Sequence, residues 1–118
     1  MGESAYDLFK EGQKRLRSGL TAQATVPLEK AKKLEPAKAS IREALGIAYF
    51  RLARWQDAER EFRTIVEELS PTDHYAHYAL GRALEHLGRT AEANGHYKLA
   101  SSMRPTDKQY AARIRELD

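Results

Sequence analysis

Hydrophobic positions along the chain recur every three to four residues, and this spacing is typical of amphipathic helices. In the first segment, Tyr6, Phe9 and Leu16 share one face of a helix over about residues 4–17. Ser18-Gly19 interrupts the pattern with a residue that readily ends a helix. The same periodicity predicts further helices over residues 21–34, 39–52, 56–69, about 73–86, 90–103 and after residue 107. We therefore expect an all-α fold.

Small and turn-forming residues repeat along the chain with one shared period. The glycines at 12, 46 and 81, the alanines at 24, 58 and 93, and the prolines at 36, 71 and 105 are separated by 34 or 35 residues. Such a period indicates a repeated helix-turn-helix unit. The phase shifts by one residue after Ile65, which places an extra residue within 66–68. A longer fourth helix or a wider turn is expected there.

Two segments contradict local helix preference. Pro27 falls inside the second helix, where it leaves the Gln23 carbonyl without its helical partner. Asn94-Gly95 is a turn-forming pair in the middle of the sixth helix. A functional kink would explain either site, but we favour the interpretation that packing against neighbouring helices overrides the local preference.

The spaced residues of the middle unit resemble the tetratricopeptide repeat. They read Leu45-Gly46-x2-Tyr49, then Ala58-x3-Phe62, then Pro71, and the third unit is similar. The resemblance implies a right-handed superhelical α-solenoid of three helix-turn-helix repeats plus a C-terminal capping helix. The implied boundaries are 5–38, 39–73 and 74–107 for the repeats and 108–118 for the capping helix, whose apolar stripe would comprise Tyr110, Ile114 and Leu117.

Composition excludes several kinds of chemistry. The chain has no cysteine, so disulfides, thiol catalysis and cysteine-bound zinc are excluded, and a reducing, cytoplasmic location is expected. No apolar run reaches the roughly 20 residues of a membrane span. His74 and His77 lie one turn apart, but no third ligand accompanies them, so no metal is expected. No nucleotide-binding or catalytic motif is present, and we predict a non-enzyme without a cofactor.

The net charge of +3 is mild, but basic residues gather in the first part of the chain. The stretch comprises Lys30, Lys32, Lys33, Lys38 and Arg42. Nucleic-acid binding is one interpretation of such a stretch. We favour a solvated helix face, because charged runs normally keep helices soluble.

Proteins of the tetratricopeptide family bind partners in a concave groove lined by the first helix of each repeat. The resemblance therefore implies a protein or peptide ligand and a set of partner-binding residues. These are Tyr6, Phe9, Gln13, Glu43, Ile47, Phe50, Arg51, Tyr75, Tyr78 and Arg82. Replacing Tyr78 or Arg82 with alanine is expected to lower the affinity for the partner and to leave the helical stack folded.

One subclass of the family captures the C-terminal carboxylate of a chaperone through lysine, asparagine and arginine side chains. The matching positions here are Phe9, Gln13, Ala44, Tyr75 and Ala79. None carries a positive charge, so we expect a more apolar segment or helix, with Arg51 and Arg82 as polar contacts. Two alternatives stay open: a subunit that self-associates, and nucleic-acid binding through the basic first repeat. The chain is expected to be a monomer or a weak homo-oligomer.

Overall fold

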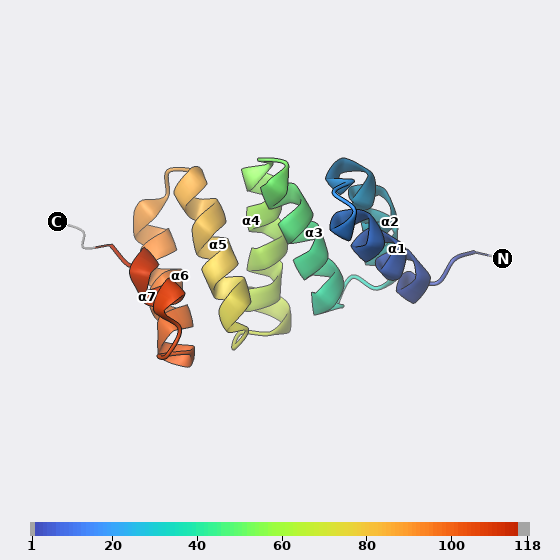
Figure 1. The fold of residues 1–118 in the computed structure, drawn as a ribbon. Helices are drawn as coiled ribbons and strands as arrows, with labels where there is room; N and C mark the ends of the chain where they lie inside the picture. The colour runs from blue at the N-terminus through green and yellow to red at the C-terminus, as the bar shows by residue number, and fades with distance from the viewer. Residues whose placement is uncertain (1, 116–118) are drawn as a thin grey trace.

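The computed structural model describes residues 2–115, which form seven α-helices, one π-helical turn and no strand (Figure 1). The elements are α1 (Ala5–Arg17), α2 (Thr21–Leu34), α3 (Ala39–Arg51), α4 (Trp55–Thr64), η1 (Ile65–Leu69), α5 (His74–His86), α6 (Thr90–Met103) and α7 (Lys108–Arg113). Neighbouring pairs stack side by side into an elongated body of 56 × 24 × 22 Å. The predicted all-α solenoid is confirmed.

The repeated glycines let the two helices of each pair approach closely. A Cβ atom added at Gly46 would lie 2.6 Å from the ring of Phe62, and one added at Gly81 would lie 2.5 Å from the ring of Tyr97. Both distances are far inside van der Waals contact. The 34- and 35-residue spacing of small residues therefore reflects three copies of one close helix crossing.

The extra residue in the second repeat is taken up by η1, at the end of α4. Here the Ser70 N–H donates to the Ile65 carbonyl, five residues earlier, rather than to a carbonyl four residues earlier. A π-helical turn accommodates one inserted residue without breaking the helix. The predicted longer fourth helix is thus confirmed, and the insertion lies where the phase shift placed it.

Pro27 lies within α2 without ending it. The helix continues from Thr21 to Leu34, and the proline ring is buried. The guanidinium of Arg15 on α1 donates a hydrogen bond of 2.9 Å to the Gln23 carbonyl, the acceptor that the proline leaves unpaired. Tertiary contact compensates for the lost helical bond, as the packing interpretation predicted.

Asn94 has a role in fixing the end of the described chain. Its side chain is only 5% exposed, and its amide donates to the Arg115 carbonyl at 2.9 Å and accepts from the Arg115 N–H at 2.7 Å. This contact explains a turn-forming residue in the middle of α6.

The last helix is shorter than predicted. It ends at Arg113, and the backbone of Ile114 is extended, because the residue that follows pairs with Asn94 rather than with the helix. Tyr110 is buried as expected, whereas Leu117 lies outside the described residues.

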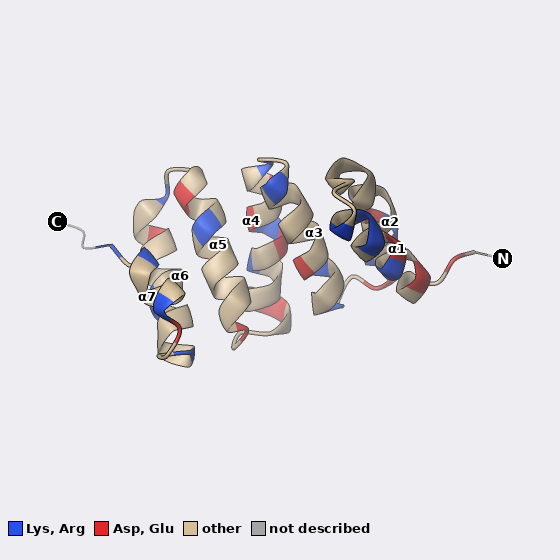
Figure 2. Cartoon of the chain, viewed as in Figure 1, with Lys and Arg blue, Asp and Glu red and all other residues tan. Residues whose placement is uncertain are grey.

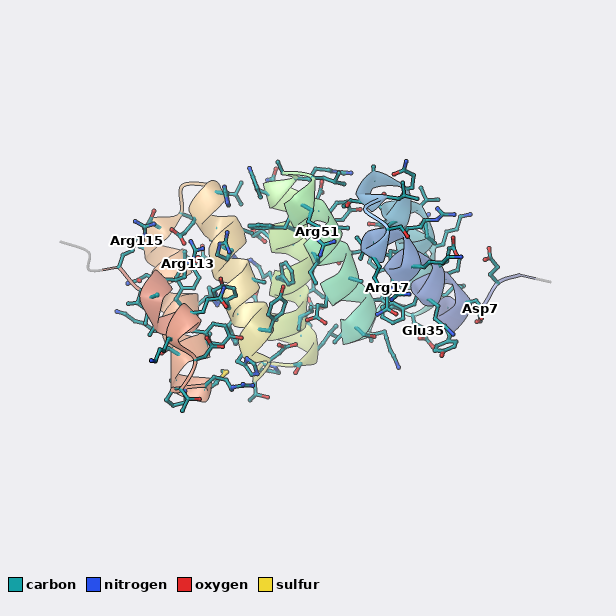
Figure 3. The ribbon with its side chains drawn as sticks, viewed as in Figure 1. Asp7, Arg17, Glu35, Arg51, Arg113 and Arg115 are labelled. Carbon is teal, nitrogen blue, oxygen red and sulfur yellow. The ribbon has the colours of Figure 1, made fainter. Side chains whose placement is uncertain are left out.

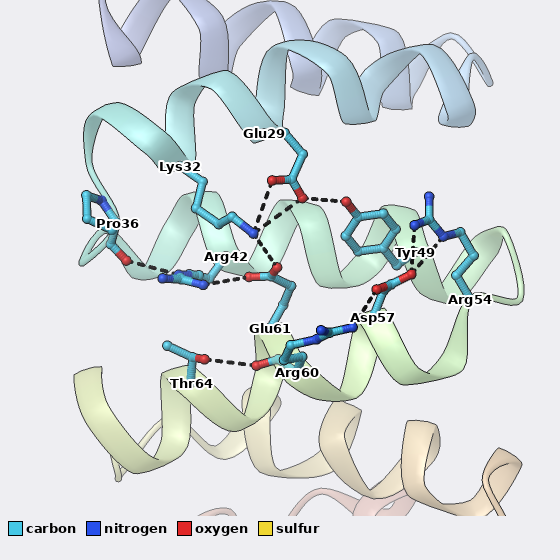
Figure 4. Close-up of polar contacts among 10 residues, drawn as sticks. All are labelled: Glu29, Lys32, Pro36, Arg42, Tyr49, Arg54, Asp57, Arg60, Glu61 and Thr64. Carbon is cyan, nitrogen blue, oxygen red and sulfur yellow. Dashed lines mark hydrogen bonds and ion pairs between the residues drawn. The ribbon is translucent and has the colours of Figure 1, made fainter.

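A buried carboxylate links the first two repeats. Glu61 on α4 is 4% exposed and forms ion pairs with Lys32 of α2, at 2.8 Å, and with Arg42 of α3, at 3.1 Å (Figure 4). Glu29 also contacts Lys32 and accepts a hydrogen bond from Tyr49. Two cations of the basic stretch are therefore internal ion-pair partners, which argues against a free nucleic-acid surface there.

Replacing Ala53 with glycine should raise the free energy of unfolding by about 0.5–1 kcal/mol. Ala53 adopts a left-handed φ of 58° in the turn where the other two repeats have Gly19 (φ 78°) and Gly88 (φ 79°). Glycine removes the clash of the Cβ atom, which outweighs the greater freedom that it gives the unfolded chain. Urea denaturation measures the change. Gly88→Ala is the matched control and should lower the free energy of unfolding by a similar amount. If both variants were as stable as the parent protein, the left-handed φ at this turn would not affect stability.

Candidate functional site

The face turned to the viewer in Figure 1 is formed by the first helix of each pair and by α7. Three adjoining hollows run along this face, and we call them together the trough. Phe9 lines the first and second hollows, and Ile47 and Arg51 line the second and third. Shared lining residues make the trough continuous from α1 to α5.

The third hollow, which we call the aromatic pocket, has a volume of about 230 Å³. It is lined by Ile47, Phe50, Arg51, Phe62, Tyr75, Tyr78, Ala79 and Arg82. The ring of Phe50 makes edge-to-face contacts with the rings of Trp55 and His86. These two rings stack on each other, with 3.8 Å between their centroids. Large rings held in place by other rings form a rigid apolar recess.

The second hollow contains the predicted residues Phe9, Gln13, Glu43, Ile47 and Arg51. Glu43, Ile47 and Arg51 occupy successive turns of α3, so an acidic, an apolar and a basic side chain follow one another down its exposed face. Tyr6 lies apart from this group, in the first hollow, and is 66% exposed. The structure thus distributes the ten predicted residues over three connected hollows rather than one pocket.

Tyr78 contributes more to the core than to the open surface. It is 6% exposed, its ring packs 4.9 Å from that of Tyr110, and its hydroxyl accepts from Gln109 at 3.0 Å and from Arg82 at 3.3 Å. The α7 helix therefore covers the outer side of Tyr78. A Tyr78→Ala variant would remove core packing, so it does not separate binding from stability as the sequence-based expectation assumed.

Glu43 on α3 and Tyr75 on α5 are partly buried and lie close enough for the charge of Glu43 to act on Tyr75. Burial, followed by the nearby charge of Asp73, raises the pKa of Glu43. Burial and the Glu43 carboxylate raise the pKa of Tyr75, while the positive charge of Arg51 acts in the opposite direction. Two carboxylates, Glu43 and Asp73, therefore lie close together on this side of the trough.

Arginines follow the opposite side. Arg17, Arg51 and Arg113 end α1, α3 and α7, and Arg82 lies one turn before the end of α5. Figure 3 shows Arg17, Arg51 and Arg113 at successive positions along the molecule, and in Figure 2 basic segments lie on the visible faces of α1 and α5. We call these four residues the arginine edge.

The arginine edge is largely free of internal ion pairs. Within residues 2–115, Arg17, Arg51, Arg82 and Arg113 take part in none of the observed salt bridges. Arg82 is positioned by aromatic rings instead, 5.2 Å from the centroid of Phe50 and 6.0 Å from that of Tyr78. Apart from the hydrogen bond from Arg82 to the Tyr78 hydroxyl, an arginine held over rings in this way keeps its donors available.

A family model of the tetratricopeptide repeat matches residues 28–107, more than half of the chain. The chain belongs to the tetratricopeptide repeat family. Superkiller complex protein 3 of Mus musculus is 27% identical over 103 residues, which cover 87% of this chain and 6% of the mouse protein. The chain thus spans a small part of that relative.

Solved tetratricopeptide structures share the fold closely. The first tetratricopeptide domain of Spaghetti (RPAP3), bound to the HSP90 peptide SRMEEVD, superposes with a TM-score of 0.89 at 23% identity, covering 95% of this chain and 88% of that one. A structure of MamA gives a TM-score of 0.89 at 24% identity, covering 93% of this chain and 64% of that one. At such identities the likeness shows the fold alone.

Sequence reasoning missed two cationic residues beside the tetratricopeptide trough. Arg113 and Arg115, together with Arg82, Glu85 and His86, line a further hollow that adjoins the aromatic pocket at Arg82. Both arginines are placed by the Asn94–Arg115 contact, which joins residues 21 positions apart. Helical periodicity in the sequence does not predict such a contact.

His74 and His77 turn away from each other despite their spacing. His74 contacts the Tyr110 hydroxyl at 2.8 Å through Nδ1, whereas His77 donates from Nε2 to the Pro71 carbonyl at 2.7 Å and lies 3.0 Å from His96 Nδ1. Burial and the neighbouring His77 lower the pKa of His96. In the part of the chain that the structure describes, no three histidine or carboxylate side chains come together to hold a metal ion.

None of the helices among residues 2–115 is long and apolar enough to cross a lipid bilayer.

Proposed function

We propose that this chain is a non-catalytic interaction module that binds a segment of a partner protein in the trough. The single observation that carries the proposal is the continuity of the trough, from Phe9 through Ile47 and Arg51 to the aromatic pocket. Aromatic and arginine side chains dominate the energetics of protein interfaces. A cytoplasmic location, expected from the lack of cysteine, belongs to the same proposal.

The chemistry of the trough favours a ligand other than a chaperone tail. The HSP90 peptide held by the Spaghetti domain ends in Glu-Glu-Val-Asp, with a terminal carboxylate. Here the positions that would match the family's carboxylate-binding residues are Phe9, Gln13, Ala44, Tyr75 and Ala79, and none is cationic. The available cations lie at Arg51 and Arg82, where they flank the aromatic pocket.

Selection from a displayed library of random 12-residue peptides tests the proposal. We expect the intact chain to retain peptides that bind with dissociation constants of about 1 μM by calorimetry. Arg51→Ala should weaken them about tenfold, because it removes a charged contact on two of the hollows. Arg60→Ala is the matched control, since Arg60 on α4 is 69% exposed and lies outside the trough.

The synthetic peptide SRMEEVD provides a second comparison. We expect it to bind at least tenfold more weakly than the selected peptides, because the trough lacks the cations for its carboxylate. Retention of no peptide at all, or equal affinity in the Arg51→Ala and Arg60→Ala variants, would place the function elsewhere.

Self-association is a second candidate, favoured by apolar side chains on the first helical pair. Tyr6, Val26 and Leu34 are 66%, 55% and 57% exposed. Single exposed apolar residues are common, but three on one helical pair suit an interface between copies. Sedimentation at several concentrations separates the two functions: an interaction module sediments at 13.4 kDa throughout, whereas a self-associating subunit gains mass with concentration.

A further inference from the structure

The trough has opposite charge on its two sides. Because the first helices of the three pairs and α7 run in the same direction, their carboxyl-terminal ends lie on one side and carry the arginine edge. Their amino-terminal ends lie on the other side, where Glu43 and Asp73 bring negative charge close together. Between α3 and α5, a bound segment therefore meets arginine side chains on one flank and the Glu43–Asp73 pair on the other.

The hollow beyond the aromatic pocket is cationic in net terms. It has a volume of about 280 Å³ and is lined by Arg82, Glu85, His86, Arg113 and Arg115. Glu85, its one acidic residue, pairs with Arg115 at 3.0 Å and accepts a hydrogen bond from Tyr97. Among the described residues Arg82 and Arg113 form no salt bridge, although the charge of Arg113 also acts on Glu85 from a greater distance. We call this hollow the arginine pocket.

The charge state of Glu85 supports this account. Burial acts to raise the pKa of Glu85, but the Tyr97 hydrogen bond and the charge of Arg115 outweigh burial and lower it. The carboxylate is thus ionised at neutral pH and is satisfied by its own neighbours. An incoming anion meets Arg82 and Arg113 rather than a free carboxylate.

Apolar and cationic recesses lie next to each other, since Arg82 lines both the aromatic pocket and the arginine pocket. A ligand that fills both needs a large apolar group and an anionic group a short distance apart. Guanidinium groups bind carboxylate and phosphate oxygens in a two-pronged geometry. Both requirements are met by neighbouring side chains of one peptide.

We infer that the trough selects a partner segment in which a large apolar side chain enters the aromatic pocket and an adjacent acidic side chain, carboxylate or phosphate, binds Arg82 and Arg113. This inference rests on the proposed function and names the partner chemistry of the same site. The Glu43 side repels acidic residues, so the acidic side chain of the segment turns to the arginine side. An acidic terminus is not required, because side-chain anions suffice.

Peptide selection on two proteins tests the inference. Random 12-residue peptides are selected with the parent chain and with the Arg82→Gln/Arg113→Gln variant, after thermal denaturation has shown that both are folded. We expect the parent to enrich a large apolar residue within four positions of Asp or Glu, and the variant to enrich the apolar residue alone. Arg113→Gln by itself, at a residue outside the core, gives the same comparison if the double variant does not fold.

The outcomes separate the two proposals. Apolar enrichment without acidic preference in the parent would overturn the acidic-partner inference and leave the proposed function standing. Failure to enrich any peptide would overturn both. Equal acidic preference in parent and variant would place the anion away from Arg82 and Arg113.

Calorimetry on one enriched peptide gives the magnitude. Replacing its acidic residue with glutamine should weaken binding to the parent about tenfold and leave binding to the variant unchanged. A phosphoserine at the same position distinguishes the two anion sources: tighter binding than glutamate, lost in the Arg113→Gln protein, assigns a phosphorylated partner, and weaker binding assigns a carboxylate. A glutamine peptide that binds the parent as tightly as the acidic one would overturn the inference.

Discussion

Replacing Glu61 with alanine should lower the free energy of unfolding by about 3 kcal/mol, because it leaves two cations without their shared partner. Glu61 is 4% exposed and lies 2.8 Å from Lys32 and 3.1 Å from Arg42. Burial acts to lower the pKa of Lys32, but Glu61 and Glu29 outweigh it and raise that pKa. Urea denaturation followed by circular dichroism measures the loss.

An exposed ion pair provides the control for Glu61. Arg60 is 69% exposed in its pair with Asp57, so Arg60→Ala should change stability by no more than about 0.5 kcal/mol. The Lys32→Ala/Glu61→Ala double variant should lose less than the sum of the single variants, since the pair is removed together. Additive losses, or a Glu61→Ala protein as stable as Arg60→Ala, would show that Glu61 does not hold the first two repeats together.

The features that the sequence predicted well are those encoded in local spacing. Helical periodicity and the repeated glycines specify which residues face a neighbouring helix, so the bounds of α2 and α6 agree with expectation. The position of the extra residue in the second repeat is also predictable, because one added residue shifts the phase of all later repeat positions. The π-helical turn η1 lies where this shift occurs.

The features that the sequence missed depend on contacts between distant residues. In the sequence, nothing distinguishes Glu61 from the other polar residues of α4. Only the fold brings Lys32 and Arg42 next to it, where they form ion pairs with its buried carboxylate. Arg113 reaches the trough because Asn94 fixes the chain beyond α7. Likewise, the packing of Tyr110 over Tyr78 could not be predicted without the fold, because it joins two helices that are distant in the sequence.

The same distinction applies to the candidate site. The list of residues on the first helix of each repeat follows from periodicity and from the family resemblance, and nine of the ten, all but Tyr6, line the two hollows between α1 and α5. Their chemistry as a set does not follow from it. The separation of Glu43 and Asp73 from Arg51 and Arg82 on opposite sides emerges only when parallel helices align their ends.

Gly46→Ala should lower the free energy of unfolding by about 2 kcal/mol, although alanine is the better helix former by about 1 kcal/mol. The Cβ atom of alanine would lie 2.6 to 2.9 Å from three carbons of the Phe62 ring, which is 1% exposed, so the ring or the helix would have to shift. Overpacking therefore outweighs helix propensity at this position. Thermal and urea denaturation measure the loss.

Gly95→Ala is the matched control, because Gly95 also lies inside a helix but has nothing within 4 Å of an added Cβ atom. There, propensity acts alone and should raise stability by about 0.5–1 kcal/mol. In the Phe62→Leu background the smaller side chain leaves room, so Gly46→Ala should lose most of its cost. If alanine stabilised the protein at both positions, the close crossing of α3 and α4 would not be the reason why glycine recurs in each repeat.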